Sequence, residues 1–297
     1  MAEVRIAVVT ARAAVGTDED DPLLLAALAG VGAEVVVVPW DDRSVKWETY
    51  DLAVIRSTWD YALRHNEFLD WARATAAVTR LRNGPDVLAW NTDKAYLAEL
   101  AAAGVPVVPT AVLHPGDDPR LPEEGEYVIK PAVGAGSVET ARYSQAEGDR
   151  ARSHVRRLLD AGRDVLVQPY QASVDERGET ALLFVDGRYS HAAHKGALLH
   201  VGGGSGAREG ELFAPEQMSA TEPSSAELAV AEQALDAAPF DRASLLYARV
   251  DLVAGADGNP LLLELELAEP SLFLAHAPHE AVTGFARSIV AAAQAHG

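Results

Sequence analysis

The sequence predicts an α/β protein in which an N-terminal domain with a parallel sheet precedes two smaller α+β lobes. Two continuous apolar runs, VRIAVVT at 4–10 and EVVVV at 34–38, are typical of buried parallel strands. Between them, an acidic cluster and Pro22 favour the start of a helix, and Gly30 and Gly32 favour its end. Near the C-terminus, two Asp-Gly pairs lie between apolar runs, which predicts antiparallel hairpins.

Composition excludes several classes of protein. A chain of 297 residues that is 48% hydrophobic and 23% charged is long enough for two or three globular lobes. The net charge of −19 argues against nucleic acid or an anionic membrane as partner, but permits a phosphorylated small ligand in a basic pocket. The absence of cysteine excludes disulfides, thiolate catalysis and sulfur-bound metals. No signal peptide is apparent, and no apolar run reaches the ~18 residues of a membrane span, so we expect a cytoplasmic protein.

The N-terminal domain has a third predicted strand that ends at candidate substrate-binding residues. The run DLAVIRS at 51–57 predicts this strand, and an amphipathic helix follows over about 65–80. Arg56 and Ser57 lie at the carboxyl end of the strand, where open α/β sheets bind ligands. We therefore expect both residues to contact the substrate, and the alternative for Arg56 is an ordinary surface ion pair.

A second, smaller lobe begins with a short helix. Asn91 or Thr92 caps this helix, which contains Lys94 and stops at Gly104, and two prolines then keep 105–110 extended. Strands are predicted at 126–130, 138–143 and 164–168, with an arginine-rich helix at about 146–161.

The loop PAVGAGS at 131–137 follows Lys130 directly. Gly134 and Gly136 allow backbone amides to approach an anion closely. The loop lacks the GxxxxGK[ST] order, so it is not the P-loop of common NTPases. The alternative interpretation is a glycine-rich hairpin connection.

The third lobe starts after Gln168, Pro169 and Tyr170. A hairpin turn at Asp186-Gly187 joins ALLFV to RYSHAAHK. The glycine-rich segment 200–209 carries Arg208 and is either a flap over a ligand or a surface loop. Alanine-rich helices are predicted at about 224–238 and 278–295.

The hairpin at 247–270 carries the most informative pattern. A two-residue turn at 257–258 places Asp251 opposite Glu264 and Arg249 opposite Glu266, all on one face. The other face then holds an apolar set that packs on a core: Val250, Leu252, Leu263, Leu265 and Leu267. Crowded carboxylates raise one another's pKa unless a cation lies among them, and this density of oxygen ligands suits magnesium. The alternatives are a solvated sheet face or a calcium module, although EF-hand spacing is absent.

The order of these motifs resembles the ATP-grasp ligase superfamily. The match runs from Lys94 through VIKPAVGAGS, VQPY and ARVDLV to LLLELELAEP and covers nearly the whole chain. It is most similar to carboxylate-amine ligases of the glutathione synthetase and D-alanine:D-alanine ligase type. The resemblance implies an ATP-grasp fold in which an N-terminal α/β domain at 1–92 precedes two lobes, 93–170 and 171–297, that grip ATP.

The resemblance also implies a role for each matching residue. Lys94 and Lys130 match lysines that contact ATP phosphates. The loop with Gly134, Gly136 and Ser137 matches the loop that covers the phosphates. The hinge that binds adenine is matched by Gln168, Pro169 and Tyr170. The metal-binding positions for Mg²⁺, with Mn²⁺ as an alternative, are Asp251, Glu264 and Glu266, although many relatives carry Asn in place of Glu266. Arg249 matches an arginine that steadies the transferred phosphate. Looser matches are Glu179 for the nucleotide and Lys195 and Arg208 for catalysis.

The implied reaction is ATP-dependent formation of a C–N bond through an acyl phosphate, with release of ADP and phosphate. The phrases VIRSTWDY and ELELAEPSLFL resemble a branch of stand-alone ATP-grasp proteins that cyclise O-ureido-D-serine to D-cycloserine. The substrate would be a small amino-acid-like molecule, and a homo-oligomer is compatible with the sequence. The alternatives are an intermolecular amino-acid or peptide ligase and a nucleotide-binding regulator without turnover.

Overall fold

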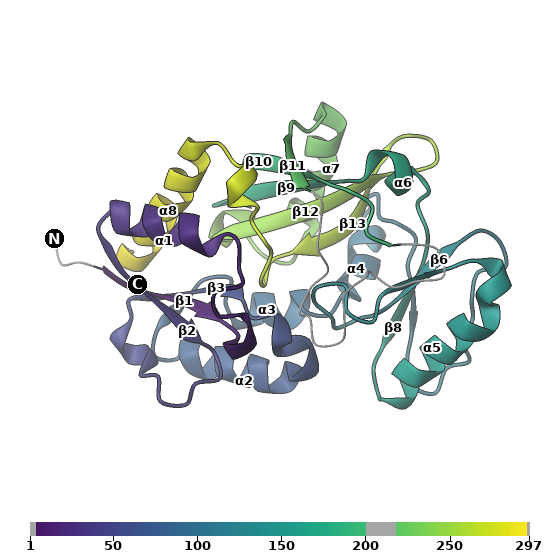
Figure 1. Cartoon of the computed structure of the whole chain (residues 1–297), viewed down its shortest axis with the longest axis horizontal. Helices are drawn as coiled ribbons and strands as arrows, with labels where there is room; N and C mark the ends of the chain where they lie inside the picture. Colours follow the sequence, from purple (N-terminus) through teal and green to yellow (C-terminus); the bar gives the residue numbers. More distant parts are fainter. Residues whose placement is uncertain (1–3, 200–217, 296–297) are drawn as a thin grey trace.

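The computed structural model of the protein describes residues 4–199 and 218–295, and its strands form three sheets (Figure 1). The first sheet has the order β2-β1-β3-β4, and all its pairs are parallel, as the apolar runs predict. Its strands are β1 (Val4–Thr10), β2 (Ala33–Pro39), β3 (Leu52–Ser57) and β4 (Arg80–Leu81).

Helices bury both faces of this first sheet. On one face, Ile6 and Val8 pack with α1 (Asp21–Gly30) and α8 (His279–Gln294). On the other face, Ala7 and Val9 pack with residues of α2 (His65–Ala76) and α3 (Pro85–Asn91). Figure 1 shows the last helix, α8, beside α1. The C-terminal helix therefore completes the N-terminal core.

The second sheet is antiparallel and forms the lobe at the opposite end of the molecule (Figure 1). Its order is β5-β8-β6-β7, with strands β5 (Ala111–Leu113), β6 (Tyr127–Pro131), β7 (Ala141–Tyr143) and β8 (Val165–Pro169). Helix α5 (Gly148–Asp160) packs on one face. Strand β7 is shorter than the predicted 138–143, because Val138 and Thr140 donate their N–H groups within the preceding loop.

The third sheet, also antiparallel, has the order β11-β10-β9-β12-β13. Its strands are β9 (Glu179–Val185), β10 (Arg188–Lys195), β11 (Met218–Thr221), β12 (Tyr247–Ala254) and β13 (Pro260–Glu266). The predicted turn at Asp186-Gly187 is confirmed: φ is +48° at Asp186 and +71° at Gly187, as in the hairpin turns that suit twisted strands. Helices α4 (Tyr96–Ala102) and α7 (Ser225–Ala237) bury one face.

Shorter helices connect these elements. They are α6 (Ser173–Arg177) and the 3₁₀ helices η1 (Arg12–Ala14), η2 (Trp47–Thr49), η3 (Trp59–Leu63), η4 (Gln145–Glu147), η5 (Arg242–Ser244) and η6 (Leu274–His276). The three sheets fall one in each of the predicted ranges 1–92, 93–170 and 171–297, and the boundaries themselves stay a prediction.

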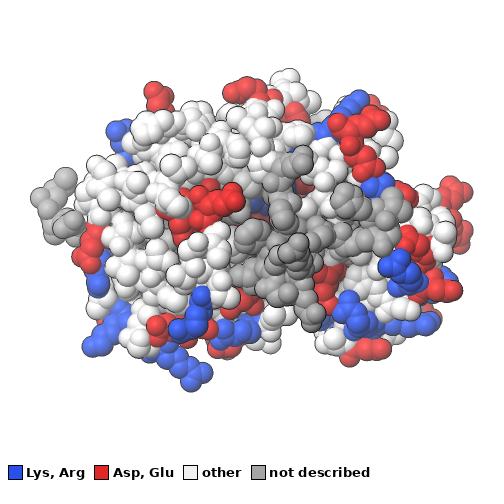
Figure 2. Space-filling view, viewed as in Figure 1, with Lys and Arg blue, Asp and Glu red and all other residues white. Residues whose placement is uncertain are grey.

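Charge on the described surface follows the composition. On the face drawn in Figure 2, blue and red side chains interleave along the lower edge, and the described residues there form no continuous basic surface. Within the described ranges, every helix is too short or too polar to cross a bilayer.

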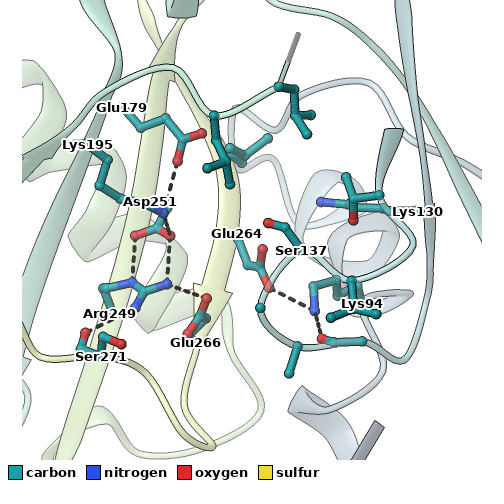
Figure 3. Close-up of a pocket in the computed structure, with 18 of the residues that line it drawn as sticks. Lys94, Lys130, Ser137, Glu179, Lys195, Arg249, Asp251, Glu264, Glu266 and Ser271 are labelled. Atoms are coloured by element: carbon teal, nitrogen blue, oxygen red, sulfur yellow. Dashed lines mark hydrogen bonds and ion pairs between the residues drawn. The ribbon is translucent and has the colours of Figure 1, made fainter. Parts of the chain in front are cut away.

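The hairpin of β12 and β13 has the predicted register at its charged residues, although its turn differs. Asp251 lies opposite Glu264 and Arg249 opposite Glu266, and these four side chains are drawn in Figure 3. The predicted two-residue turn is wrong: the loop spans 255–259, where the Gly255 N–H donates to the Asn259 carbonyl at 2.7 Å.

A β-bulge reconciles the longer loop with that register. Leu252 pairs with Leu262, whereas the next pair along is Asp251 with Glu264, so Leu263 is the extra residue. The bulge turns Leu263 out of the core face where we predicted it, and Leu262 is buried there with an exposed fraction of 0%. Leu263 and Glu264 consequently both border the same cleft.

The segment around Lys94 is not the helix that the sequence predicted. Helix α3 ends at Asn91 and α4 begins at Tyr96, so Lys94 lies in the turn between them. Its N–H donates to the Ala132 carbonyl at 2.9 Å, which fixes this turn against the loop after β6.

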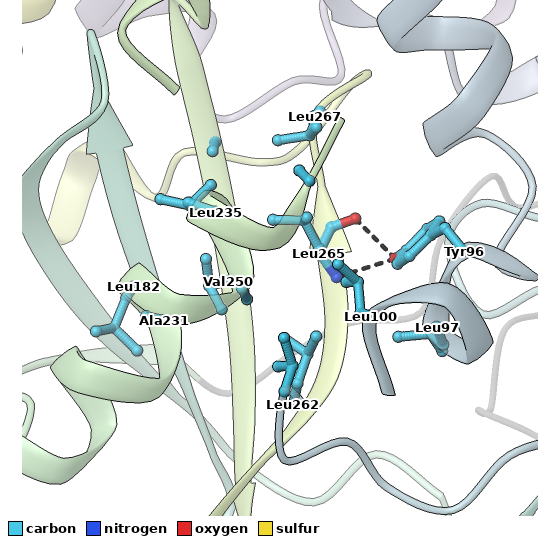
Figure 4. Close-up of a cluster of buried hydrophobic side chains, with 14 of the residues drawn as sticks. Tyr96, Leu97, Leu100, Leu182, Ala231, Leu235, Val250, Leu262, Leu265 and Leu267 are labelled. Carbon is cyan, nitrogen blue, oxygen red and sulfur yellow. Dashed lines mark hydrogen bonds between the residues drawn. The ribbon is translucent and has the colours of Figure 1, made fainter. Parts of the chain in front are cut away.

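Side chains from this region satisfy the backbone of the edge strand β13. The Tyr96 hydroxyl donates to the Leu265 carbonyl at 2.7 Å and accepts from the Leu265 N–H at 2.9 Å (Figure 4). Asn91, predicted as a helix cap, donates to the same carbonyl at 2.8 Å and accepts from the Leu267 N–H at 2.6 Å. These bonds attach β13, and with it Glu264 and Glu266, to the N-terminal part of the chain.

We expect Tyr96→Phe to lower the free energy of unfolding by about 2 kcal/mol, because it leaves a buried N–H at Leu265 without its acceptor. Urea unfolding measures the change. Tyr127→Phe is the matched control, since the structure gives the Tyr127 hydroxyl no hydrogen bond to another described residue. Equal stability of the two variants would contradict this account of β13.

Candidate active site

A cleft of about 410 Å³ lies between the second and third sheets and reaches loops of the N-terminal domain. Its volume is in the range of small-molecule sites. Along β12 and β13 the lining changes from an apolar end at Val253 and Leu263, through a charged middle, to an end with aromatic and acidic side chains beyond Glu266.

The apolar end contains Val108, Val174 and Val253, with Tyr170 and the bulged Leu263 packed against them. The Tyr170 hydroxyl donates to Asp175 at 2.7 Å, and the Arg142 guanidinium lies 3.5 Å from the centre of its ring. Gln168 and Pro169, which precede Tyr170, also line this end. The zone suits a flat, largely apolar ring, at the place where the resemblance implies adenine.

Lys94 links the middle of the cleft to the glycine loop. Its Nζ lies 2.9 Å from Glu264 Oε1 and donates to the Gly134 carbonyl at 2.6 Å (Figure 3). Burial lowers the pKa of Lys94, but the Glu264 carboxylate outweighs burial and holds it above its ordinary value. Lys94 is therefore a fixed cation in the cleft.

Lys130 enters the cleft from β6 and is buried. Burial lowers its pKa, and the Glu264 carboxylate counters only part of that effect. The loop residues Gly134, Gly136 and Ser137 line the same wall. An anion would offset the desolvation of Lys130, so this wall suits phosphate oxygens.

Arg249 and Lys195 surround the carboxylate of Asp251. Arg249 Nε and Nη2 lie 2.9 and 3.0 Å from its two oxygens, and Lys195 Nζ lies 3.2 Å from Asp251 and 3.1 Å from Glu179 (Figure 3). Burial would raise the pKa of Asp251, but Arg249 and Lys195 outweigh it and keep the pKa below its ordinary value. Arg249 also pairs with Glu266.

Carboxyl groups outnumber cationic side chains in this part of the cleft. Burial raises the pKa of Glu266 to about 8 and that of Glu269 to about 7, and neighbouring carboxylates add to both shifts. Lining carboxylates here are Glu179, Asp251, Glu264, Glu266 and Glu269; lining cations are Lys94, Lys130, Lys195 and Arg249. A further cation bound here would lower these raised pKa values and displace the protons.

The predicted metal ligands fit magnesium by their chemistry. Over 4–199 and 218–295, no group of acidic or histidine side chains forms a ready cluster for a metal ion, because the carboxylates pair with lysine and arginine. Carboxylate oxygens are nonetheless the donors that magnesium prefers, and a divalent ion would offset the mutual repulsion that helps to raise the pKa of Glu266. Asp251, Glu264 and Glu266 would hold such an ion once Lys94 and Arg249 move toward a phosphate.

The raised pKa of Glu269 predicts a pH dependence. Its folded-state pKa of about 7 exceeds the ordinary 4.5, so the folded state binds a proton that the unfolded state releases. The contribution to stability is present below about pH 4.5 and is lost as the pH rises through about 7. Relative to Glu269→Gln, the unliganded wild type should therefore lose stability between about pH 4.5 and 7, as denaturant unfolding measures. An identical pH profile for both proteins would refute the shift, and the exposed Glu34→Gln is the control.

The aromatic, acidic end of the cleft contains residues that were not predicted as site residues. Trp59, Tyr61, Glu269 and Phe273 line it, together with the acidic residues of 18–20. The position of STWDY could have predicted two of them, because this segment directly follows β3 at the carboxyl edge of a parallel sheet, where ligands bind. Aromatic rings and carboxylates together suit a ligand with an ammonium group.

Arg56 and Ser57, predicted to contact the substrate, do not line the cleft. Both have an exposed fraction of 0%, since Arg56 pairs with Asp20 at 3.4 Å and Ser57 shares a hydrogen bond of 2.8 Å with Thr10. The loop before α1 lies over this strand end and takes the place we expected for substrate. Arg208 and the glycine-rich segment 200–209 lie outside the residues described in full.

Comparisons with known proteins agree with this architecture. Residues 6–83 match the family described as the N-terminal domain of D-cycloserine synthetase DcsG. The chain is 41% identical over 283 residues to the cycloserine biosynthesis protein DcsG of Streptomyces lavendulae, covering 91% of this chain and 92% of that protein. The crystal structure of D-cycloserine synthetase DcsG matches with a TM-score of 0.86 and 39% identity, over 98% of this chain and 100% of that one.

More distant structures share the fold. D-alanine–D-alanine ligase of Bacillus anthracis, complexed with ATP, has a TM-score of 0.64 at 14% identity, covering 98% of this chain and 97% of that one. The ATP-grasp ligase PsnB with a minimal precursor has a TM-score of 0.62 at 19% identity, covering 98% and 99%. The predicted ATP-grasp fold is thereby confirmed, and the chain belongs to the DcsG family of ATP-grasp enzymes, ligases that form a C–N bond.

Proposed function

We propose that this enzyme cyclises O-ureido-D-serine to D-cycloserine, with ATP as the phosphoryl donor and magnesium as the metal. The observation that carries the proposal is the order of zones in one cleft: an apolar end, a middle with four cationic side chains, and an aromatic, acidic end. This order matches a base, a chain of phosphates and an amino acid. The 41% identity to a cycloserine biosynthesis protein supports the choice of substrate.

ATP would bind with its base beside Tyr170 and Leu263 and its phosphates beside Lys94 and Lys130. The glycine loop at 134–137 would cover the phosphates with backbone N–H groups. Magnesium, when bound to Asp251, Glu264 and Glu266, would neutralise charge on the phosphate oxygens. Lys94 and Arg249 would exchange their carboxylate partners for phosphate oxygens, where their charges stabilise the transferred group.

The substrate carboxylate then attacks the γ-phosphorus, an acyl phosphate forms, and ADP leaves. Arg249, at the border between the charged middle and the acidic end, would hold the transferred group. The nitrogen bonded to oxygen in the ureido group attacks the acyl carbon, which closes a five-membered ring and expels phosphate. The ring product lacks the carbamoyl group, so atoms balance when one water releases that group as CO₂ and ammonia. Glu269, with a pKa of about 7, is suited to accept the nitrogen's proton.

The test is incubation of the purified protein with ATP, magnesium and O-ureido-D-serine. We expect ADP, the ring product and ammonia in equal amounts, measured by coupled assay and mass spectrometry. Ammonia separates this reaction from ligation of two molecules, which releases ADP without it. Absence of the ring product, or ADP release only when a second amino acid is added, would overturn the proposal.

A further inference from the structure

We propose that Phe273 sets the size of the acyl-substrate pocket, and that Asp20 and Arg56 are positioning residues that hold it in place. This inference rests on the proposed function, because it assumes that an amino acid occupies the aromatic, acidic end of the cleft. It also assigns a role to Arg56, whose side chain does not reach the cleft.

Phe273 has a backbone conformation that is rare for a bulky residue. Its φ of 51° and ψ of 42° are left-handed, a region that glycine or asparagine usually occupies. A strained conformation persists only where surrounding contacts determine it, and such positions gather at functional sites. Phe273 lines the cleft, so the strain lies at the site itself.

Hydrogen bonds on both sides of Phe273 determine this conformation. The two oxygens of Asp20 accept the N–H groups of Leu272 and Leu274, both at 2.6 Å. His191 Nε2 donates to the Leu272 carbonyl at 2.8 Å. Arg249 Nη1 donates to the Ser271 carbonyl at 3.0 Å, a contact drawn in Figure 3. The segment 271–274 is therefore clamped from the N-terminal domain, from β10 and from β12.

Arg56 pairs with Asp20, the residue that accepts the hydrogen bonds of Leu272 and Leu274. Its Nη2 lies 3.4 Å from Asp20 Oδ2, and its carbon Cζ lies 5.7 Å from the centre of the Tyr247 ring. Within the described residues, its Nε and Nη1 have no hydrogen-bond partner, although Asp18 and Asp21 are close enough to feel its charge. Removal of one member of a buried ion pair leaves the other charge uncompensated, so Arg56 lets Asp20 remain in the interior.

The ring of Phe273 forms a wall beside the reacting groups. Its centre lies 5.1 Å from the guanidinium carbon of Arg249, the residue that we propose to hold the transferred phosphate. With the base and phosphates assigned to the other two zones, the acyl chain of the substrate is left with the zone that Phe273, Trp59 and Tyr61 line. A rigid ring at this place would exclude a branch at the β-carbon of the side chain. The substrate class is therefore a small amino acid without a branch at its β-carbon.

The first experiment compares O-ureido-D-serine with O-ureido-D-threonine, which closes the same ring but carries one extra methyl group. Phe273→Gly removes the ring while glycine adopts the left-handed conformation without strain, so the backbone is preserved. We expect the ratio of kcat/KM for the threonine analogue to that for the serine substrate to rise about tenfold or more in the variant. Phe240→Ala, which removes a phenyl ring outside the cleft, should leave the ratio unchanged.

The second experiment tests the clamp. Asp20→Asn keeps the size of the side chain but replaces one accepting oxygen, so we expect KM for the amino acid to rise about tenfold while KM for ATP stays within about twofold. Arg56→Lys, which keeps the charge, should show a smaller rise. A general loss of structure would instead raise both KM values and lower Tm, and Asp42→Asn, on the exposed surface, is the matched control.

The outcomes separate the two proposals. Failure of the wild type to cyclise O-ureido-D-serine overturns the proposed function and this inference with it. A wild type that turns over, with an unchanged substrate ratio in Phe273→Gly, overturns only the role of Phe273. An unchanged KM for the amino acid in Asp20→Asn, or equal rises in the KM values for the amino acid and for ATP, overturns the role of the clamp.

Discussion

Glu264→Gln is expected to reduce kcat/KM by about 10²–10³-fold while the fold is retained. Glu264 is the carboxylate that pairs with Lys94 at 2.9 Å, and it also acts on the pKa of Lys130. Burial would raise its own pKa, but Lys94 and Lys130 outweigh burial and keep it below its ordinary value, so the group is ionised at neutral pH. Glutamine preserves its shape and removes the charge that a magnesium ion requires.

Steady-state assays at several magnesium concentrations measure this effect. The apparent magnesium requirement should rise along with the loss of rate, because we propose that Glu264 binds the metal rather than the amino acid. Circular dichroism checks the fold, and Glu34→Gln, an exposed residue of β2 paired with Arg5, should behave as wild type. A variant with near-wild-type rates at limiting magnesium would refute the assignment of Glu264.

Arg249→Met is expected to abolish turnover and to lower the free energy of unfolding by about 3–5 kcal/mol. The guanidinium forms two bonds to Asp251, pairs with Glu266 and binds the Ser271 carbonyl, and its exposed fraction is 6%. Methionine fills similar space without charge. Asp251 and Glu266 would then lose their shared partner in the interior, and only Lys195 would remain beside Asp251.

The pH dependence of this loss has a definite sign. The pKa of Asp251 is lowered in the folded protein, so its pairing stabilises the fold above its unfolded pKa of 3.8 and is lost as the pH falls through the lower folded value. The stability difference between wild type and Arg249→Met should therefore be larger near neutral pH than near about pH 4. Guanidinium titrations at both pH values measure it.

A double variant and a surface control make the test specific. Arg249→Met combined with Glu266→Gln should recover part of the stability, since one of the unpaired carboxylates is gone, but none of the activity. Arg73→Met, which removes an exposed pair with Asp70, should cost at most about 1 kcal/mol. If Arg249→Met were no less stable than Arg73→Met, the charge cluster would not contribute as the geometry indicates.

The register of the charged hairpin shows how a correct prediction can rest on a partly wrong reason. The sequence predicted a two-residue turn, whereas the loop is longer and the bulge at Leu263 compensates for the difference. Alternation along a strand is a local property, so it placed Asp251, Glu264 and Glu266 on one face. The bulge depends on packing around Val108 and Val253, which alternation does not contain.

Arg56 and Lys94 show where local patterns are insufficient. Arg56 stands at a strand end that faces ligands in many open sheets, but the loop carrying Asp20 covers it. Lys94 lies in a stretch with helical composition, but bonds to Ala132 and Gly134 hold it in a turn. In both cases the deciding contact comes from residues 36 or more positions away.

The sequence by itself determined the parallel N-terminal sheet, the C-terminal hairpins, the face shared by the carboxylates and the ATP-grasp resemblance. Periodicity, turn residues and motif order are local properties of the chain, and these features depend on them. Only the tertiary structure decided which residues form the aromatic, acidic end of the cleft. Asp20 meets Leu272 and Leu274 across 252 and 254 positions of sequence, and this contact sets the conformation of Phe273. Such a contact exists only after the C-terminal segment packs on the N-terminal sheet, so no local pattern encodes it.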